Sequence, residues 1–230
     1  MKMVKRFVRM LAGGLLPLLL VGQASAVIVS GSVTGTTVNT AGSTFVVLGA
    51  GPTAVGGNAD FLSKDVYGLN EKQGVTVGAG GQAVQGGTIA AGTEVDSQLI
   101  FANLNNTGAV SAVIKFASKV LGVIVQSNPN PDTLTPSSAV YGRGNVTYNG
   151  SAANGWGMES GYVFAGFTEG VSISGDNEIT FTAAGINVDS VRVLTARLVP
   201  EPGSIAILGF AAVAFVGVAR RRRRVVVAAE

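Results

Sequence analysis

Two apolar segments, one near each end, limit the part of this chain that can fold as a globular domain to the residues between them. The first segment, Leu11 to Val21, follows a group of basic residues at the N-terminus. The second, Gly203 to Ala219, has 17 residues without a charge and is followed by arginines. As a helix it would be about 25 Å long, the lower limit for crossing a bilayer. Because basic clusters beside apolar spans stay cytoplasmic, both ends predict that residues 27 to 198 lie outside the cytoplasmic membrane.

Residues 1 to 26 have the three parts of a secretory signal peptide. Basic residues come first, the apolar core follows, and Ala24-Ser25-Ala26 satisfies the rule of small residues at the cleavage site. We therefore predict a mature chain that begins at Val27, with the secretion translocon as a partner. A short transmembrane anchor is the alternative, and the cleavage triplet and the short apolar core argue against it. The basic residues are Lys2, Lys5, Arg6 and Arg9.

The C-terminal segment has a Pro-Glu-Pro motif ahead of its apolar run and an arginine cluster behind it. Order, spacing and position closely resemble the PEP-CTERM sorting signal. The resemblance implies recognition by an exosortase, a membrane cysteine transpeptidase that cuts near the motif and releases the protein or transfers it to the cell surface. Residues 225 to 230 make the tail longer than is usual for such signals, and a permanent single-span anchor is the alternative. The motif is Val199, Pro200, Glu201 and Pro202, and the cluster that stops transfer is Arg220, Arg221, Arg222, Arg223 and Arg224.

The charged residues are distributed unevenly, and two residue types that matter for catalysis are missing. Residues 27 to 202 include seven basic and twelve acidic side chains, a net charge of −5, although the whole chain carries +3. This acidic balance argues against nucleic acid as a partner. The chain has no Cys and no His, which excludes disulfides, Ser-His-Asp and Cys-His catalysis. No cofactor is expected.

Short apolar runs with period-two alternation fill residues 27 to 198, separated by Gly, Asn and Pro. No stretch of twelve or more residues keeps a helical stripe. We therefore predict an all-β fold, a single β-sandwich of the jelly-roll kind, between the signal peptide (1–26) and the sorting signal (199–230) with its transmembrane helix. The predicted strands are 27–33, 44–48, 74–77, 98–104, 110–116, 121–126, 162–167, 171–174, 178–182 and 190–198, and the predicted loops are 78–92, 127–138 and 142–157.

Two groups of side chains in this domain suggest binding. Glu94 and Asp96 share one face of a strand and could hold Ca²⁺, although the absence of a calcium-binding loop motif favours a solvated strand. Trp156 and Tyr148 lie in Gly-rich segments where exposed rings would stack on sugars, although aromatic residues more often pack in a core. No metal site other than the Ca²⁺ candidate is expected.

From these features we expect a protein without enzyme activity that is exported through the inner membrane. Before processing it is anchored in that membrane, and afterwards it is at the cell surface or extracellular. Its expected role is structural or adhesive, in an exopolysaccharide matrix or biofilm. A carbohydrate-binding module is the first alternative. A glycoside hydrolase or lyase is the second, because the twelve acidic residues permit a pair of catalytic carboxylates.

Overall fold

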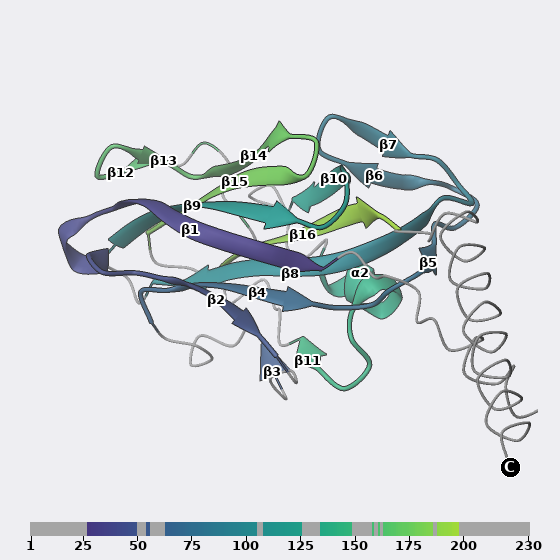
Figure 1. The fold of residues 1–230 in the computed structure, drawn as a ribbon, viewed down its shortest axis with the longest axis horizontal. Helices are drawn as coiled ribbons and strands as arrows, with labels where there is room; N and C mark the ends of the chain where they lie inside the picture. The colour runs from purple at the N-terminus through teal and green to yellow at the C-terminus, as the bar shows by residue number, and fades with distance from the viewer. Residues whose placement is uncertain are drawn as a thin grey trace, which may run out of the picture. The chain divides into compact units, whose positions relative to one another are not determined.

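The computed structural model describes residues 27–49, 54–55, 63–104, 108–125, 134–148, 158, 161, 163–185 and 188–197. These residues belong to one compact unit, Ser25–Arg197. Residues 1–24 and 198–230 do not belong to this unit and lie outside the described part. Within the described part the fold is all-β, as the sequence predicts, with one short α-helix and one 3₁₀ turn (Figure 1).

The smaller of the two main sheets has four strands among the described residues. Its order is β1-β9-β15-β14, and every neighbouring pair is antiparallel. Alternation explains the burial on β9, since the side chains at 110, 112, 114 and 116 face inward and those between them are more exposed. The strands are β1 (Ile28–Thr36), β9 (Gly108–Phe116), β15 (Glu178–Gly185) and β14 (Gly170–Gly175).

The larger sheet has the order β10-β16-β8-β4-β2, and β5 also pairs with β8. Its pairs are antiparallel except β2 with β4, which is parallel. Unlike β9, the central strands β8 and β16 are buried at almost every position, on both faces. The strands are β10 (Val120–Val125), β16 (Val188–Ala196), β8 (Glu94–Asn103), β4 (Val66–Asn70), β2 (Phe45–Leu48) and β5 (Val75–Thr76).

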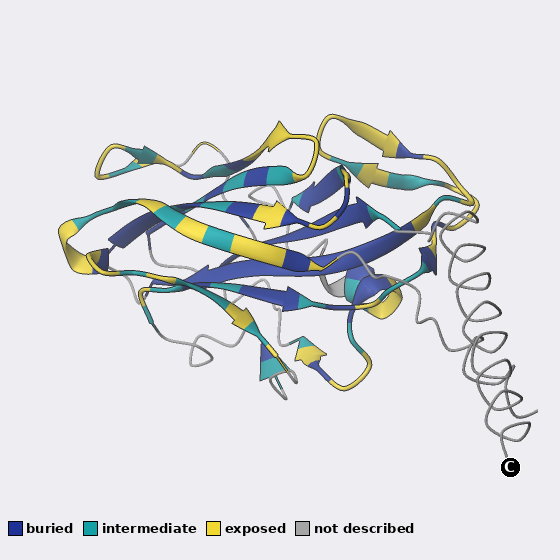
Figure 2. Cartoon of the chain, viewed as in Figure 1, coloured by how far each residue is buried: buried dark blue, intermediate teal, exposed yellow. Residues whose placement is uncertain are grey.

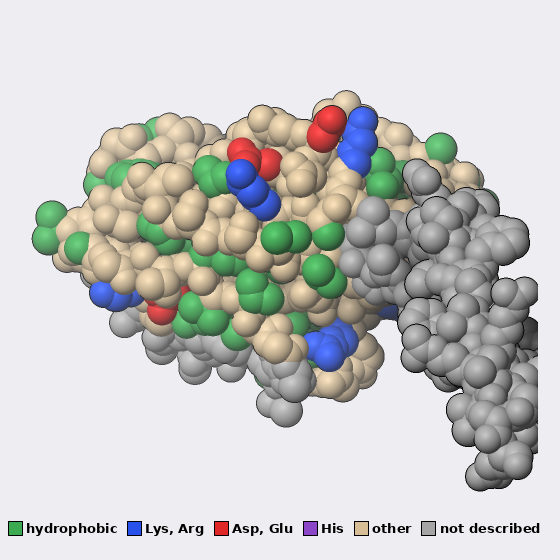
Figure 3. Space-filling model, in the orientation of Figure 1, with side chains coloured by type: hydrophobic (Ala, Val, Ile, Leu, Met, Phe, Trp, Pro, Cys, Tyr) green, Lys and Arg blue, Asp and Glu red, His purple; other side chains and the backbone are tan. Residues whose placement is uncertain are grey.

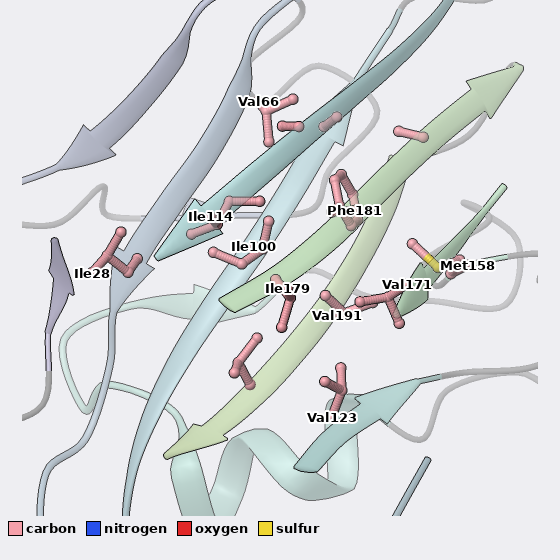
Figure 4. Close-up of a cluster of buried hydrophobic side chains, with 14 of the residues drawn as sticks. Ile28, Val66, Ile100, Ile114, Val123, Met158, Val171, Ile179, Phe181 and Val191 are labelled. Atoms are coloured by element: carbon pink, nitrogen blue, oxygen red, sulfur yellow. The ribbon is translucent and has the colours of Figure 1, made fainter. Parts of the chain in front are cut away.

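The main core lies between the two sheets. Ile114, Ile179 and Phe181 of the smaller sheet pack against Ile100 and Val191 of the larger one (Figure 4). All five side chains are fully buried, which at roughly 25 cal/mol per Å² makes this interface the main favourable contribution to folding. The predicted β-sandwich is confirmed.

A second core covers the outer face of the larger sheet and explains the burial of its central strands. Leu99, Phe101 and Leu194 point to this face and pack with Ile89 and Tyr141 from outside the sheet. Figure 2 shows β8 and β16 buried along their lengths, whereas β1 alternates between exposed and partly buried residues. The covering elements are the hairpin β6 (Gln82–Val84) and β7 (Gly87–Ile89), the helix α2 (Leu134–Tyr141), and the parallel pair β3 (Ala54–Val55) and β11 (Thr147–Tyr148).

Three predicted loops are wrong in part, because they contain these covering elements. The segment 127–138 includes the first residues of α2, the segment 78–92 contains the hairpin β6–β7, and the segment 142–157 contains β11. The predicted strands do not include β4, which lies between β8 and β2, and the predicted strand 162–167 is a short hairpin of β12 (Val163–Phe164) and β13 (Phe167–Thr168). The other predicted strands are confirmed within a few residues at their ends.

Both ends of the described unit are hydrogen-bonded to the turn between β9 and β10. The N–H of Ala117 donates to the carbonyl of Val27 at 2.9 Å. The N–H of Ala196 donates to the carbonyl of Lys119 at 2.8 Å, and the Ser118 hydroxyl donates to the Ala196 carbonyl at 2.5 Å. The chain therefore enters and leaves the sandwich at the same end.

Candidate functional site

A buried ion pair lies on the outer face of the larger sheet. Arg192 is on β16 between two inward-facing valines, so alternation turns its side chain outward. Its Nε and Nη2 donate to the two carboxylate oxygens of Glu71 at 2.6 and 2.9 Å. Both side chains have no exposed area. Such a two-pronged contact between a guanidinium and a carboxylate is the strong form of this interaction.

The backbone places Glu71 directly beneath the guanidinium. The Glu71 N–H donates to the carbonyl of Ser97, and the Ser97 N–H donates to the carbonyl of Lys72, both at 2.9 Å. These bonds continue the pairing of β4 with β8 by two residues. The Ser97 hydroxyl also donates to Glu71 Oε2 at 2.7 Å, which gives the carboxylate a further partner.

The same guanidinium holds the helix α2 on the sheet. Its Nη1 donates to the Ser137 hydroxyl, and its Nη2 donates to the Ser138 hydroxyl at 3.0 Å. The helix has a very short apolar face, so these polar contacts and the buried ring of Tyr141 fix its position. Burial raises the pKa of Tyr141 above its usual value, and the Arg192 charge opposes part of that rise.

Tyr148 closes one side of this arrangement. The Arg192 guanidinium lies over the Tyr148 ring, 5.6 Å from its centroid. The Tyr148 hydroxyl accepts from the Arg143 N–H at 2.7 Å. Burial raises the pKa of Tyr148 well above the usual tyrosine value, and the neighbouring Glu71 charge raises it further. The phenol therefore stays neutral at neutral pH.

A cavity of about 540 Å³ opens above these residues. Lys72 Nζ donates to the Val140 carbonyl at 3.2 Å, and Arg143 Nη1 donates to the Gly49 carbonyl at 3.2 Å. A side chain at Gly142 would lie 2.7 Å from the Tyr148 ring, so glycine is required there. The lining residues are Glu71, Lys72, Ser138, Ala139, Gly142, Arg143, Gly144, Val146 and Tyr148.

This arrangement is suited to binding rather than to proton transfer. The carboxylate, the guanidinium and the serine hydroxyls are hydrogen-bonded in one network, and the phenol ring packs against the guanidinium. The two remaining charged groups of the lining, Lys72 and Arg143, are cations that donate to backbone carbonyls. The cavity therefore offers positive charge at its wall above a neutral, rigid floor.

The sequence predicts Tyr148 as a contact residue but misses the ion pair beneath it. Tyr148 is half-buried at the cavity wall, and its predicted companion Trp156 lies outside the described residues. The signal that could have found the pair is the arginine in the middle of an apolar strand, at Val191-Arg192-Val193. The alternation of side chains along β16 predicts that this arginine points away from the main core, towards solvent. The sequence of β16 does not show that a second core covers that face.

The two predicted Ca²⁺ ligands each have a protein partner. Glu94 Oε2 accepts from Arg197 Nη1 at 2.8 Å, and Asp96 Oδ1 accepts from the Gly74 N–H at 2.7 Å. Asp96 is fully buried, whereas Glu94 is exposed. Within the described ranges no group of three or more acidic, His or Cys side chains is placed to hold a metal ion. The Ca²⁺ site stays a prediction.

Most of the predicted sorting and processing residues lie outside the described part of the chain. They include Ala24 and Ala26 of the cleavage site, residues 199–202 and residues 220–224. Of the helices in the described part, none is long and apolar enough to span a membrane. The predicted transmembrane segment 203–219 is not among the described residues.

One comparison with known proteins gives a match. The family model of the PEP-CTERM protein-sorting motif matches residues 198–224. Neither the curated proteins nor the solved structures give a match. The predicted sorting signal is therefore confirmed, and it indicates an exported protein that is sorted by an exosortase, with its C-terminus anchored in the membrane before processing.

Proposed function

Because this chain carries a PEP-CTERM sorting motif, we propose that its folded part is a structural or adhesive protein of the cell surface or the extracellular matrix, without enzyme activity. The sorting motif carries the proposal, since an exosortase substrate is delivered to the outside of the cell. The proposed surroundings are an exopolysaccharide matrix or biofilm.

The chemistry of the described residues supports a role without turnover. The polar groups of the candidate site are bonded to one another, and they join β16, β4 and α2 into one rigid body. The chain lacks His and Cys, the residues that most often serve as general base and as thiol nucleophile. On the surface, charged side chains are sparse and occur in small separate groups, as the face in Figure 3 shows.

The test combines the mature mass with a matrix phenotype in the native host. Three strains are compared: wild type, a deletion of this protein, and a strain with Pro200→Ala, Glu201→Ala and Pro202→Ala together. We expect the wild-type protein to begin at Val27, to end near residues 200–203 and to fractionate outside the inner membrane. The motif variant should keep its tail and remain in the membrane fraction.

The phenotype separates the proposed role from the sorting itself. We expect the deletion and the motif variant to form biofilm or flocs with reduced cohesion, because both lack the protein outside the cell. Normal cohesion in both strains, with the variant correctly retained in the membrane, would count against a structural role. Release of sugars from the purified matrix by the mature protein would instead show an enzyme.

A further inference from the structure

The basic side chains of the folded part are distributed in a way that singles out the cavity. All seven of them, between residues 27 and 202, lie in the described part. Four have an acidic partner within 4 Å: Lys115, Lys119, Arg192 and Arg197. The other three, Lys64, Lys72 and Arg143, donate to backbone carbonyls. Two of these three line the same cavity.

The cavity wall keeps its positive charge because its acidic member is already neutralised. Glu71 is fully buried and paired with Arg192, which is also fully buried. Among the described lining residues, Lys72 and Arg143 therefore leave a net charge of +2. A concave site with walls of low dielectric constant concentrates such a field. This local charge contrasts with the net −5 of residues 27 to 202.

The shape of the cavity is set by contacts that do not need a ligand. The Tyr148 hydroxyl is held by the backbone of Arg143, and Ser138 is held by Arg192. Gly142 leaves no room for a side chain between Ser138 and Tyr148. A preformed site binds with a smaller entropic cost than one that must be ordered by its ligand.

The volume and lining of the cavity define the size and polarity of what would fit. About 540 Å³ lies in the range of roughly 300–1,000 Å³ that is usual for small-molecule sites. The lining combines charged and hydroxyl groups with glycines and with the apolar side chains of Ala139 and Val146, of which Val146 is buried. The charged groups suit an anionic ligand, and the apolar part can contact the carbon atoms of a ring.

We infer that this cavity binds an anionic sugar of about one ring, with its carboxylate or phosphate held by Lys72 and Arg143. The arginine fork matches either group with paired hydrogen bonds, and the lysine adds a point charge. Ser138 and Tyr148, which also line the cavity, would lie beside the sugar. This inference does not depend on the adhesive role, because it concerns a site in the folded part alone.

The test is calorimetric titration of the mature exported chain with four probes. The probes are glucuronate, glucose 6-phosphate, glucose and inorganic phosphate. We expect at least one of the two charged sugars to bind saturably, and glucose and inorganic phosphate to bind about tenfold more weakly or worse. The charged sugar that binds with the lower dissociation constant shows whether the site prefers a carboxylate or a phosphate.

Variants tie the binding to the cavity. Lys72→Gln combined with Arg143→Gln should weaken binding of the charged sugar about tenfold or more. Lys64→Gln is the matched control, because among the described residues Lys64 likewise donates to a backbone carbonyl but does not line the cavity. Circular dichroism and the melting temperature should be near wild type for both variants, since within the described part each altered side chain donates to one backbone carbonyl.

Three results would overturn the inference. The first is no saturable binding of either charged sugar at millimolar concentration. The second is inorganic phosphate binding as tightly as the charged sugars, which would show a site for charge alone. The third is equal loss of binding in Lys64→Gln, which would place the binding elsewhere on the surface.

Discussion

Arg192 shows how one residue can connect a sheet to the elements that cover its outer face. Its stem leaves β16 on the outer face, and its guanidinium contacts Glu71 after β4, Ser138 on α2 and the ring of Tyr148. Taking both charges out of water costs several kcal/mol per ion, so the pair contributes more to a unique arrangement than to net stability. Removing only one partner would leave the other charge buried and unpaired.

We predict that Glu71→Gln lowers the free energy of unfolding by about 3–5 kcal/mol, because it leaves the Arg192 charge buried without a counter-ion. Urea denaturation at neutral pH measures this loss. Asp176→Asn is the matched control, since it breaks an exposed pair with Lys119 at 3.8 Å that should be worth about 0–1 kcal/mol. Equal losses in the two variants would contradict the buried-pair account.

We predict that the fold loses stability as the pH rises above about 10, and that Tyr148 carries part of this loss. Burial raises the pKa of Tyr148 in the folded state, so the unfolded chain releases this proton at lower pH than the folded chain does. The stability that the Tyr148 phenol contributes is fully present below pH 10, which is about the pKa of tyrosine in the unfolded chain. Above that pH the free energy of unfolding falls by up to about 1.4 kcal/mol per pH unit. The measurement is urea denaturation between pH 9 and 11.5.

The comparison with Tyr148→Phe isolates this residue from the lysines and from Tyr141, whose pKa is raised in the same direction. The variant should be less stable at pH 7, because the hydrogen bond that the hydroxyl accepts from the Arg143 N–H is lost. Its stability should then fall less steeply with pH than that of the wild type. If the free energy of unfolding fell equally steeply with pH in the variant and in the wild type, Tyr148 would not be the group that causes the loss of stability.

At the scale of elements, the sequence predicts the strands that form the main core and misses those that cover it. Strands such as β9 and β15 alternate cleanly because one face meets the core and the other meets solvent. The hairpin β6–β7 and the helix α2 carry no such periodicity, since each has only a few inward residues on a Gly-, Ser- or Pro-rich background. Their positions depend on the outer face of the larger sheet, which no local pattern reveals.

The same reason explains the candidate site. Tyr148 could be proposed from its neighbours in sequence, but Glu71, Lys72 and Arg143 belong to segments that meet only in the folded chain. The sorting motif was predictable because its residues act in order along the chain and require no tertiary contact.

We predict that Gly122→Ala destabilises the packing of the β6–β7 hairpin on β10. A Cβ at residue 122 would lie 2.7 Å from the Cβ of Val84, and the neighbouring bond from the Gln85 N–H to the Val123 carbonyl is 2.8 Å long. Overpacking of this kind costs about 1–3 kcal/mol. Hydrogen exchange should show faster exchange of the Gln85 amide. Gly78→Ala is the control, because nothing lies within 4 Å of a Cβ there, and similar exchange in both variants would refute the steric account.

At the scale of the whole molecule, the last strand has a central place. β16 pairs with β8 over nine residues and with β10 on its other side, and it supplies both Val191 to the main core and Arg192 to the buried pair. The larger sheet without β16 would be two separate pieces. The compact unit ends at Arg197, directly after this strand.

We predict that a mature chain cut after Arg197 unfolds cooperatively at nearly the wild-type temperature, because every described strand is kept. A chain cut after Asn187 lacks β16 and should show no cooperative transition. Circular dichroism during heating distinguishes the two. A sharp transition in the shorter chain would mean that β8 and β10 can close the sheet without β16.

The position of β16 sets an order of events during export. Ala196 lies three residues before Val199 of the sorting motif, and the chain crosses the membrane from its N-terminus. The strand that joins the two halves of the larger sheet is therefore the last to reach the outside, and the sorting signal follows it at once. We therefore expect the larger sheet to close while the tail still anchors the chain in the membrane. A chain that stops early would lack both the closing strand and the sorting signal.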